Sequence, residues 1–507
     1  MSDRAYITTP LYYVNAEPHL GSTYTNVVAD TLARFQRQRG VPTVLQTGTD
    51  EHGEKIAETA REAGVSPKDF VDDVAAKFQA TWDSCGIEYD NFIRTSNPAH
   101  IEFVQGVLAR LHENDDIYFG SYEGLYCIGC ERLYTEKELK DGLCPDHLTK
   151  PSEVSEPNYF FRMAKYQDAV REHIEKNPRF IHPEGYRNET LAILRDDLGD
   201  LCISRPKERL SWGIELPFDS NYVTYVWFDA LLNYVSGPAT LGRLDELWPA
   251  TLHLIGKDIL KPHAVFWPTM LLAAGFPLYD RLGVGGFWSS GGHKMSKSLG
   301  NVAKPLELRD KYGMDALRYF LLRDMAFGQD ADFTEQALIT RLNADLANGL
   351  GNLVSRTLAM SNKYFDGQIQ PRLPEEPADA ALAAAFATAR TQLDQHIDNL
   401  AFHRGLGAVW EAIDAANKYV ADQAPFKLVK DEAQRPRVGA ILHNCVEALR
   451  VAAQLCAPVL PESAEKIREA LGLSSDRFAD LDLAWGDAFQ DGHALGGPIN
   501  LFPRVEA

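Results

Sequence analysis

The chain has 507 residues, 45% of them hydrophobic and 24% charged, which is an ordinary composition for a globular protein of several domains. Its formal net charge of −20 excludes a protein that holds nucleic acid by bulk charge, so any RNA contact must use local basic patches and shape. No basic segment followed by an apolar one opens the sequence, and no run of about 18 apolar residues occurs, so we expect neither signal peptide nor membrane span and a cytoplasmic location.

The N-terminal segment predicts a strand, a helix and a second strand. Residues 5–14 are rich in Thr, Tyr and Ile, His19-Leu20-Gly21 opens a helix that ends near Gly40, and 41–47 form the next strand. This order begins a Rossmann-type, doubly wound parallel α/β sheet. Such sheets bind ligands beyond the carboxyl ends of their strands, where His19 and residues 48–53 fall.

The remaining chain divides by its periodicity. Residues 116–221 break the α/β rhythm and are interpreted as an insertion, after which strands are predicted at 223–229, 252–256 and 281–284. Beyond Gly313, apolar stripes at helical spacing predict a helical bundle, with a proline-rich loop at 370–377. The predicted order is a first α/β half at 1–115, the insertion at 116–221, a second α/β half at 222–282, a loop-bearing segment at 283–345 and an all-α domain at 346–507.

The cysteines indicate a metal site. Three of the seven fall between Cys127 and Cys144, in the pattern Cys127-x2-Cys130-x13-Cys144-x2-His147. Each close pair can chelate one ion, and a Cys3His set fills the tetrahedral coordination of zinc. We therefore predict one structural Zn²⁺ that orders a small zinc-knuckle lobe in the insertion.

Two motifs suit phosphate chemistry. Lys294 and Lys297 lie in the loop Gly292-His293-Lys294-Met295-Ser296-Lys297-Ser298, and Pro18-His19-Leu20-Gly21-Ser22 opens the first helix. Taken singly, a solvated lysine loop and a histidine in an ordinary turn are the commoner explanations. A helix N-terminus nevertheless favours anions, and two lysines three residues apart can neutralise a polyphosphate.

Together the two motifs resemble the paired HIGH and KMSKS signatures of the class I aminoacyl-tRNA synthetases. The resemblance implies that ATP with Mg²⁺ is the phosphate substrate and that His19, Lys294 and Lys297 are catalytic. It implies ATP contacts for His19, Gly21, Ser22, Lys294, Ser296 and Lys297. The family usually has a second histidine where this chain has Ser22, which can cap the helix or donate to a phosphate oxygen.

Four patches between these motifs resemble the methionyl-tRNA synthetase family in particular. They are 9–15 (TPLYYVN), 48–53 (GTDEHG), 225–230 (YVWFDA) and 256–263. The resemblance implies that Asp50 pairs with the ammonium of methionine and that apolar and aromatic side chains surround its thioether, with Tyr13 and His263 nearest the sulfur. The implied methionine-binding residues are Leu11, Tyr13, Asp50, Trp227, Ala230, Tyr234, Ile259 and His263. Many relatives have proline where this chain has Leu231.

The helical end carries an RNA-binding pattern. Asn348, Asn352 and Arg356 recur every fourth residue, so they share one face of a helix, and amides with a guanidinium can read splayed bases. This is similar to the family's Asn-x3-Asn-x3-Arg pattern, and Phe426 stands in a segment that resembles its base-stacking patch. The resemblance implies an anticodon-binding domain at 346–507 and a stem-contact region within 283–345.

The family resemblance implies a methionine–tRNA ligase, which forms methionyl-adenylate from ATP and methionine and transfers the acyl group to tRNA(Met), the initiator included. Because the chain ends soon after the bundle, we expect a monomer. Another class I synthetase, a simple nucleotidyltransferase and a catalytically silent RNA-binding paralogue are the alternatives. The helical domain argues against a nucleotidyltransferase, and intact His19, Asp50, Lys294 and Lys297 argue against a silent paralogue.

Overall fold

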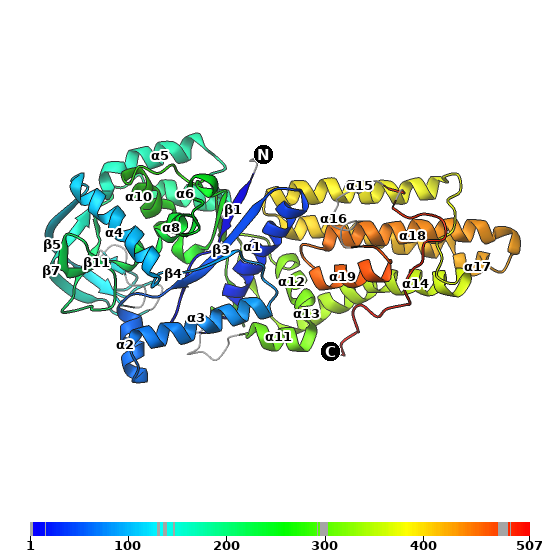
Figure 1. The fold of residues 1–507 in the computed structure, drawn as a ribbon, viewed down its shortest axis with the longest axis horizontal. Helices are drawn as coiled ribbons and strands as arrows, with labels where there is room; N and C mark the ends of the chain where they lie inside the picture. The colour runs from blue at the N-terminus through cyan, green and yellow to red at the C-terminus, as the bar shows by residue number, and fades with distance from the viewer. Residues whose placement is uncertain are drawn as a thin grey trace. The chain divides into compact units, whose positions relative to one another are not determined.

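The computed structural model describes residues 4–15, 17–128, 132–134, 139–145, 148–291, 293–294, 303–474, 485–486 and 488–506. The chain forms two compact units (Figure 1). The first comprises Met1–Ala29 with Pro42–Gly285, and the second comprises Asp30–Val41 with Gly286–Ala507. In the described part of the chain, no helix has both the length and the apolar character needed to cross a membrane.

A seven-stranded parallel sheet forms the centre of the first unit, as predicted. The strand order is β2-β3-β1-β13-β14-β8, and β4 also pairs with β3 (Figure 1). The strands are β1 (Ala5–Thr8), β2 (Tyr12–Tyr13), β3 (Thr43–Asp50), β4 (Asn91–Arg94), β8 (Ile181–His182), β13 (Leu252–Gly256) and β14 (Leu282–Gly285). Strand β3 is buried from Val44 to Asp50, as expected for a central strand covered on both faces.

Helices surround this sheet. They are α1 (Leu20–Gln38), α2 (Glu54–Ala63), α3 (Pro67–Ser84), α4 (Pro98–Glu113), α5 (Gln167–Lys176), α6 (Glu184–Ile193), α7 (Val226–Ala230), α8 (Asn233–Thr240), α9 (Leu244–Leu247) and α10 (Trp267–Ala273). Local sequence sets where they begin: Ser66 and Asn97 cap α3 and α4, each followed by proline in the first turn. Gly48 is required in β3, because a Cβ there would lie 1.9 Å from the carbonyl oxygen of Ile93.

The region predicted as an insertion forms two smaller antiparallel sheets. One joins β6 (Arg132–Tyr134), β5 (Ile117–Cys127), β7 (Ser152–Phe161) and β9 (Leu201–Cys202); the other joins β10 (Ser204–Pro206), β12 (Asp219–Thr224) and β11 (Glu215–Leu216). Between β7 and β9, two strands of the first of these sheets, the chain returns to the main sheet, where β8 pairs with β14. Residues 116–221 therefore contribute one strand to the parallel sheet as well.

The prediction of a main-sheet strand at 223–229 is wrong. Strand β12 ends at Thr224 in the three-stranded sheet, and the chain then turns into the short helix α7. The run of β-branched and aromatic residues favoured a strand, but the backbone N–H of Asp229 bonds to the carbonyl of Tyr225 at 3.1 Å. Tertiary contacts of α7, described below, outweigh the local strand propensity.

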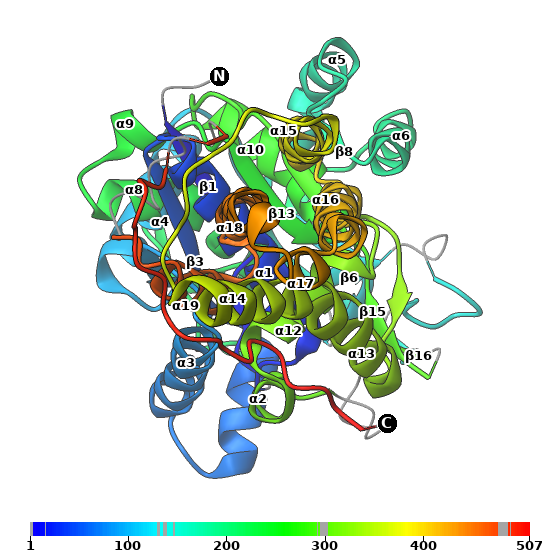
Figure 2. The same ribbon diagram turned by 90° about the vertical axis from the view of Figure 1, so that its right-hand side faces the viewer.

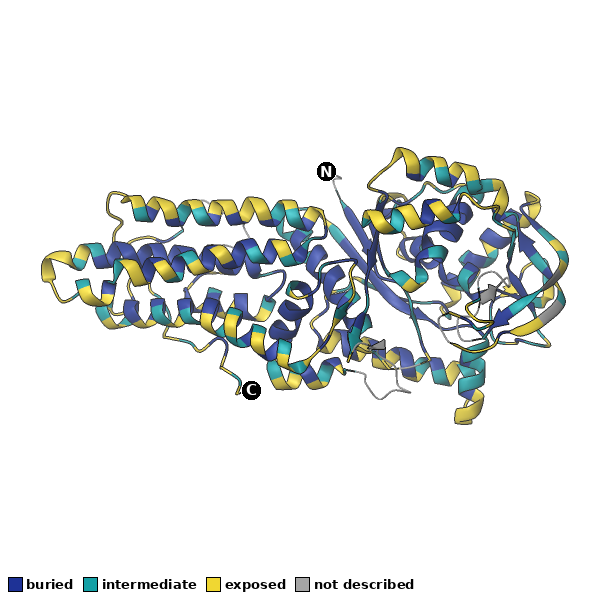
Figure 3. Ribbon diagram, turned by 180° about the vertical axis from the view of Figure 1, so that it is seen from behind, coloured by how far each residue is buried: buried dark blue, intermediate teal, exposed yellow. Residues whose placement is uncertain are grey.

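The second unit is mainly helical, as predicted for its C-terminal part. Its helices are α11 (Pro305–Tyr312), α12 (Met314–Arg323), α13 (Glu335–Arg341), η6 (Leu342–Gly351), α14 (Asn352–Phe365), α15 (Pro377–Asp398), α16 (Phe402–Gln423), α17 (Pro425–Leu428), α18 (Arg435–Cys456) and α19 (Pro461–Ala470). Figure 2 looks along this bundle, and Figure 3 shows how deeply α18 is buried. Every residue of α18 from Val438 to Cys456 is buried, so this helix is the centre of the core.

The helix that carries Asn348 is not the regular α-helix that the leucine spacing predicts. Residues Leu342–Gly351 form a π-helix, which continues into α14. Two side chains of α16 donate to its carbonyl oxygens: Trp410 Nε1 to Asp345 at 3.0 Å and Asn417 Nδ2 to Gly349 at 3.0 Å. These donors stabilise the wider turn, and Gly349 and Gly351 add backbone freedom to this stretch.

Candidate active site

His19 lies at the N-terminus of α1, and its ring bonds back to the helix. Its Nδ1 accepts hydrogen bonds from the backbone N–H groups of Gly21 at 3.0 Å and of Ser22 at 3.4 Å. A nitrogen that accepts carries no hydrogen, so the neutral ring is protonated on Nε2, the atom that can donate to a phosphate oxygen. The side chain is exposed at the helix end where the dipole favours anions.

Ser22 stabilises this turn from inside. Its buried hydroxyl donates to the carbonyl oxygen of His19 at 2.8 Å and accepts from the backbone N–H of His19 at 3.0 Å. A hydroxyl has one hydrogen, and that hydrogen is used within the turn. Ser22 therefore fixes the backbone of His19, and its predicted contact with ATP stays a prediction.

Asp50 ends β3 beside β2, at the carboxyl edge of the sheet. Tyr13 is its partner across the strands, and the backbone N–H of Val14 donates to the Asp50 carbonyl at 3.2 Å. Successive strand residues face opposite sides of a sheet, so Tyr13 points away from Tyr12, whose ring stacks on α3. Leu11, directly before β2, is half-buried. The register therefore places the backbones of Asp50 and Tyr13 side by side.

Helix α7 carries two of the predicted residues on one side. Trp227 and Ala230 are three residues apart, which places them on the same helical face. The Trp227 ring meets that of His263 edge-on, with centroids 6.1 Å apart. Leu231, which follows the helix, is buried. The helix therefore places both side chains on one face. In the predicted strand, residues three apart would point to opposite faces of the sheet.

A buried hydrogen-bonded pair connects the remaining predicted residues. His263 Nδ1–H donates to the carbonyl oxygen of Ile259 at 2.9 Å, and the Tyr234 hydroxyl donates to Nε2 at 2.8 Å. Burial lowers the pKa of His263 to about 4, so the ring is neutral at physiological pH, as this pattern requires. Both ring nitrogens are engaged, which fixes the orientation of the two rings.

The sequence did not predict three further side chains that lie among these residues. The carboxylate of Asp229, on α7, contacts His52 Nδ1 at 2.7 Å and His100 Nε2 at 2.8 Å, and all three residues are buried. His52 and Asp229 belong to two of the quoted patches, but the family resemblance implies methionine contacts for other residues of those patches. His100 is remote in sequence, and no local signal identifies it.

The lysine loop belongs to the second unit. A short sheet joins β17 (Ala331–Asp332), β15 (Trp288–Ser290) and β16 (His293–Lys294), which places the backbone of Lys294 opposite Ser289. Gly291 turns between the two antiparallel strands with a φ of +63°, which favours glycine. Ser296 and Lys297, with the rest of the predicted phosphate loop, lie outside the described residues.

Two of the four predicted metal ligands are described. Cys127, which ends β5, and Cys144 are buried and pack against each other in a small cluster with Leu125 and Leu139. The backbone N–H of Cys144 donates to the Thr149 carbonyl at 2.9 Å. Cys130 and His147 lie outside the described residues, and within those residues no group of three or more His, Cys, Asp or Glu is placed to hold a metal.

The predicted RNA-binding residues lie along η6 and α14 and on α17. Asn348 is exposed and accepts a hydrogen bond from the guanidinium of Arg504. The amide of Asn352 donates to Asn417 Oδ1 at 2.9 Å. Phe426, on α17, is one of the few large apolar side chains exposed on this unit, at 39%. An exposed ring is available for stacking, as the prediction requires.

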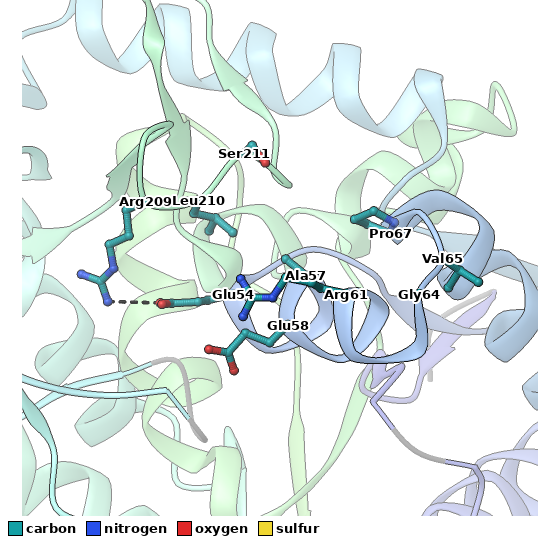
Figure 4. Close-up of a pocket in the computed structure, with 10 residues that line it drawn as sticks. All are labelled: Glu54, Ala57, Glu58, Arg61, Gly64, Val65, Pro67, Arg209, Leu210 and Ser211. Carbon is teal, nitrogen blue, oxygen red and sulfur yellow. Dashed lines mark hydrogen bonds and ion pairs between the residues drawn. The ribbon is translucent and has the colours of Figure 1, made fainter.

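A separate pocket lies between α2 and residues 209–211 (Figure 4). Its ten lining residues include none of the predicted site residues: Glu54, Ala57, Glu58, Arg61, Gly64, Val65, Pro67, Arg209, Leu210 and Ser211. Arg209 is paired with Glu54 at 3.1 Å and with Glu156 at 3.2 Å. The positive charge of Arg209 is thus balanced by carboxylates of the protein itself, and we assign no ligand to this pocket.

Family models match nearly the whole chain. The model described as tRNA synthetases class I (M) matches residues 5–153 and 147–358. The model described as the anticodon binding domain of methionyl tRNA ligase matches residues 374–507. The first covers the α/β unit with the lysine loop and η6, and the second covers most of the helical bundle.

Relatives named methionine--tRNA ligase and a solved structure match essentially the whole of this chain. The chain is 43% identical to the methionine--tRNA ligase of Caldanaerobacter subterraneus subsp. tengcongensis, over 100% of this chain and 80% of that protein. It is 43% identical to that of Nostoc sp., over 99% of this chain and 97% of that protein. Mycobacterium tuberculosis methionyl-tRNA synthetase in complex with methionyl-adenylate superposes with a TM-score of 0.95 and 39% identity, over 99% of this chain and 100% of that one.

Proposed function

Because this chain belongs to the methionyl-tRNA synthetase family and is a class I methionine–tRNA ligase, we propose which of its residues perform each step. The enzyme activates methionine with ATP and transfers the acyl group to tRNA. The placement of His19 and Asp50 at the carboxyl edge of one parallel sheet supports the assignment of activation to this edge.

Asp50 binds the ammonium group of methionine. It is the anion at the end of β3, beside Tyr13, and a buried carboxylate attracts a cation strongly because little water screens it. The thioether lies among Leu11, Tyr13, Trp227, Ala230, Tyr234, Ile259 and His263. The neutral, doubly hydrogen-bonded His263 holds Tyr234 and introduces no charge beside an apolar side chain.

ATP reacts without a general base, because the methionine carboxylate is already an anion. A carboxylate oxygen of methionine attacks the α-phosphorus of ATP. The bond from this phosphorus to the oxygen that bridges the α- and β-phosphates breaks, and pyrophosphate leaves. His19 Nε2–H donates to an α-phosphate oxygen at the N-terminus of α1, while Gly21 lets the backbone approach the nucleotide. Lys294 and Lys297 neutralise the departing pyrophosphate, which carries the magnesium of the substrate MgATP.

The helical unit binds the anticodon of tRNA(Met). Asn348, Asn352 and Arg356 contact the bases, and Phe426 stacks on one of them. The exposure of Asn348 and Phe426 supports this assignment.

Replacing Arg356 with alanine is expected to leave methionyl-adenylate formation unchanged and to lower kcat/KM for tRNA aminoacylation by about 10- to 100-fold, since one base contact contributes about 1–3 kcal/mol. ATP–pyrophosphate exchange and aminoacylation of tRNA are measured on the same preparation. Arg390→Ala, which removes an exposed arginine from α15, is the charge-matched control. Equal losses in both assays would argue against anticodon binding by Arg356.

We propose that Cys127, Cys130, Cys144 and His147 would hold one structural zinc ion. Among the described residues, Cys127 and Cys144 are buried together with only Leu125 and Leu139 packed against them, and such a small apolar cluster fits a knuckle ordered by a metal. When bound, the ion supplies the cross-link that such a lobe lacks.

Elemental analysis is expected to find one zinc per chain. The double variant Cys127→Ser, Cys144→Ser should contain less than one tenth of that amount, because serine is a poor zinc ligand. Cys445→Ser, which alters a buried thiol of α18, should retain the full amount. Wild-type protein without zinc would contradict the site.

A further inference from the structure

A buried carboxylate bridges two histidines in the first unit. Asp229 Oδ2 contacts His52 Nδ1 at 2.7 Å and Oδ1 contacts His100 Nε2 at 2.8 Å, while His100 Nδ1 contacts Ser236 Oγ at 2.6 Å. The Asp229 side chain is 1% exposed. A carboxylate only accepts, so both facing imidazole nitrogens carry hydrogens.

Asp229 is an anion in this setting. Burial alone would raise the pKa of its carboxyl group, but the two imidazoles, through charge and hydrogen bonds, hold the pKa below its usual range. A buried anion with two donors is a specific arrangement, because losing either donor leaves part of the carboxylate unsatisfied.

The bridge connects two groups of proposed methionine-binding residues, those on α7 and Asp50 at the end of β3. Asp229 lies on α7 between Trp227 and Ala230, and His52 follows Asp50 by two residues. His100 comes from α4 and adds a third anchor. Helix α7 has only five residues, too few to be stable alone, so contacts with the rest of the protein must set its position.

We propose that His52, Asp229 and His100 are positioning residues for methionine: the bridge holds α7, with Trp227 and Ala230, at a fixed place relative to Asp50. The bridge thereby sets methionine affinity without touching methionine or ATP. This inference rests on the proposed methionine site.

Asp229→Asn is the central variant. An amide can accept from only one imidazole and presents its NH2 group to the other, so α7 shifts while side-chain volume is kept. The Michaelis constant for methionine in ATP–pyrophosphate exchange is expected to rise about tenfold or more, and that for ATP to change less than about twofold. A merely structural role would reduce activity through folded fraction and leave both constants unchanged.

Conservative variants distinguish the effect of the hydrogen bonds to Asp229 from the effect of the imidazole rings themselves. His52→Asn places an amide nitrogen near the position of Nδ1, and His100→Gln places one near Nε2, so both should keep a methionine constant closer to wild type than His52→Ala and His100→Ala. His52 is the most exposed of the three residues, at 5%, and its variants test the proposal if Asp229→Asn folds poorly.

Asp116→Asn is the matched control. Asp116 is another buried carboxylate of this unit, bonded to Lys165 at 2.7 Å and Tyr166 at 2.9 Å, and its loss should leave the methionine constant unchanged. The proposal is overturned if Asp229→Asn and His52→Ala leave that constant within about twofold of wild type while Trp227→Ala raises it. If Trp227→Ala also has no effect, the methionine-site assignment fails, and the bridge with it.

Discussion

Replacing Asp50 with alanine is expected to abolish methionine binding at ordinary concentrations. Removing one member of a buried charge pair costs about 3–5 kcal/mol, which corresponds to a loss of affinity between about a hundredfold and several thousandfold. Asp50 is buried at the end of β3, so water cannot replace the lost carboxylate. Equilibrium titration with methionine, without ATP, measures the effect.

A methionine analogue that lacks the ammonium group identifies the interaction responsible. It should bind wild type and Asp50→Ala with similar, weak affinity, because neither complex has the charge pair. Asp50→Asn, which keeps the shape of the side chain, should lose most of the methionine affinity too. Wild-type affinity for methionine in Asp50→Ala would exclude contact between Asp50 and the ammonium group.

Replacing Lys297 with alanine should slow methionyl-adenylate formation by about 100- to 1,000-fold, the usual effect of removing one group that stabilises developing charge. No general base is needed for attack by a carboxylate, so the role proposed for this lysine is to stabilise the leaving pyrophosphate. Rapid-quench measurement of the first turnover detects the loss. Methionine affinity should stay within about twofold of wild type, because the contact proposed for this lysine is with phosphate alone.

Lys304→Ala is the control for Lys297. Lys304 precedes α11 in the same unit and pairs with Glu307 at 2.9 Å, so removing it changes net charge by the same amount. Adenylate formation should be unchanged in this variant. Equal slowing in both variants would indicate a general electrostatic effect, and normal kinetics in Lys297→Ala would exclude a role in phosphate stabilisation.

The parts of the fold with strong local signals were predictable. Apolar spacing and a terminal glycine indicated α1. The strand predicted at 41–47 is β3, although it begins at Thr43 and continues to Asp50, inside the GTDEHG patch. The strand predicted at 223–229 failed because its β-branched and aromatic residues also suit a short buried helix. That choice depends on the contacts of Asp229 with His52 and His100, which a linear pattern does not contain.

The π-helix at Leu342–Gly351 could not be predicted from the sequence for a similar reason. Four-residue spacing of leucines fits an α-helix, while the donors that widen its turns, Trp410 and Asn417, come from a helix more than sixty residues later. Individual site residues were indicated by motif, but their hydrogen-bonding states were not. The protonated Nε2 of His19 and the neutral ring of His263 follow only from three-dimensional contacts.

Amino-acid-dependent ATP–pyrophosphate exchange by the intact chain tests the central claim most directly, because it reports which amino acid the α/β unit activates. Methionine should stimulate exchange strongly in the absence of tRNA, and leucine and cysteine at the same concentration should not. Exchange stimulated by leucine or cysteine but not by methionine would contradict the assignment of the site.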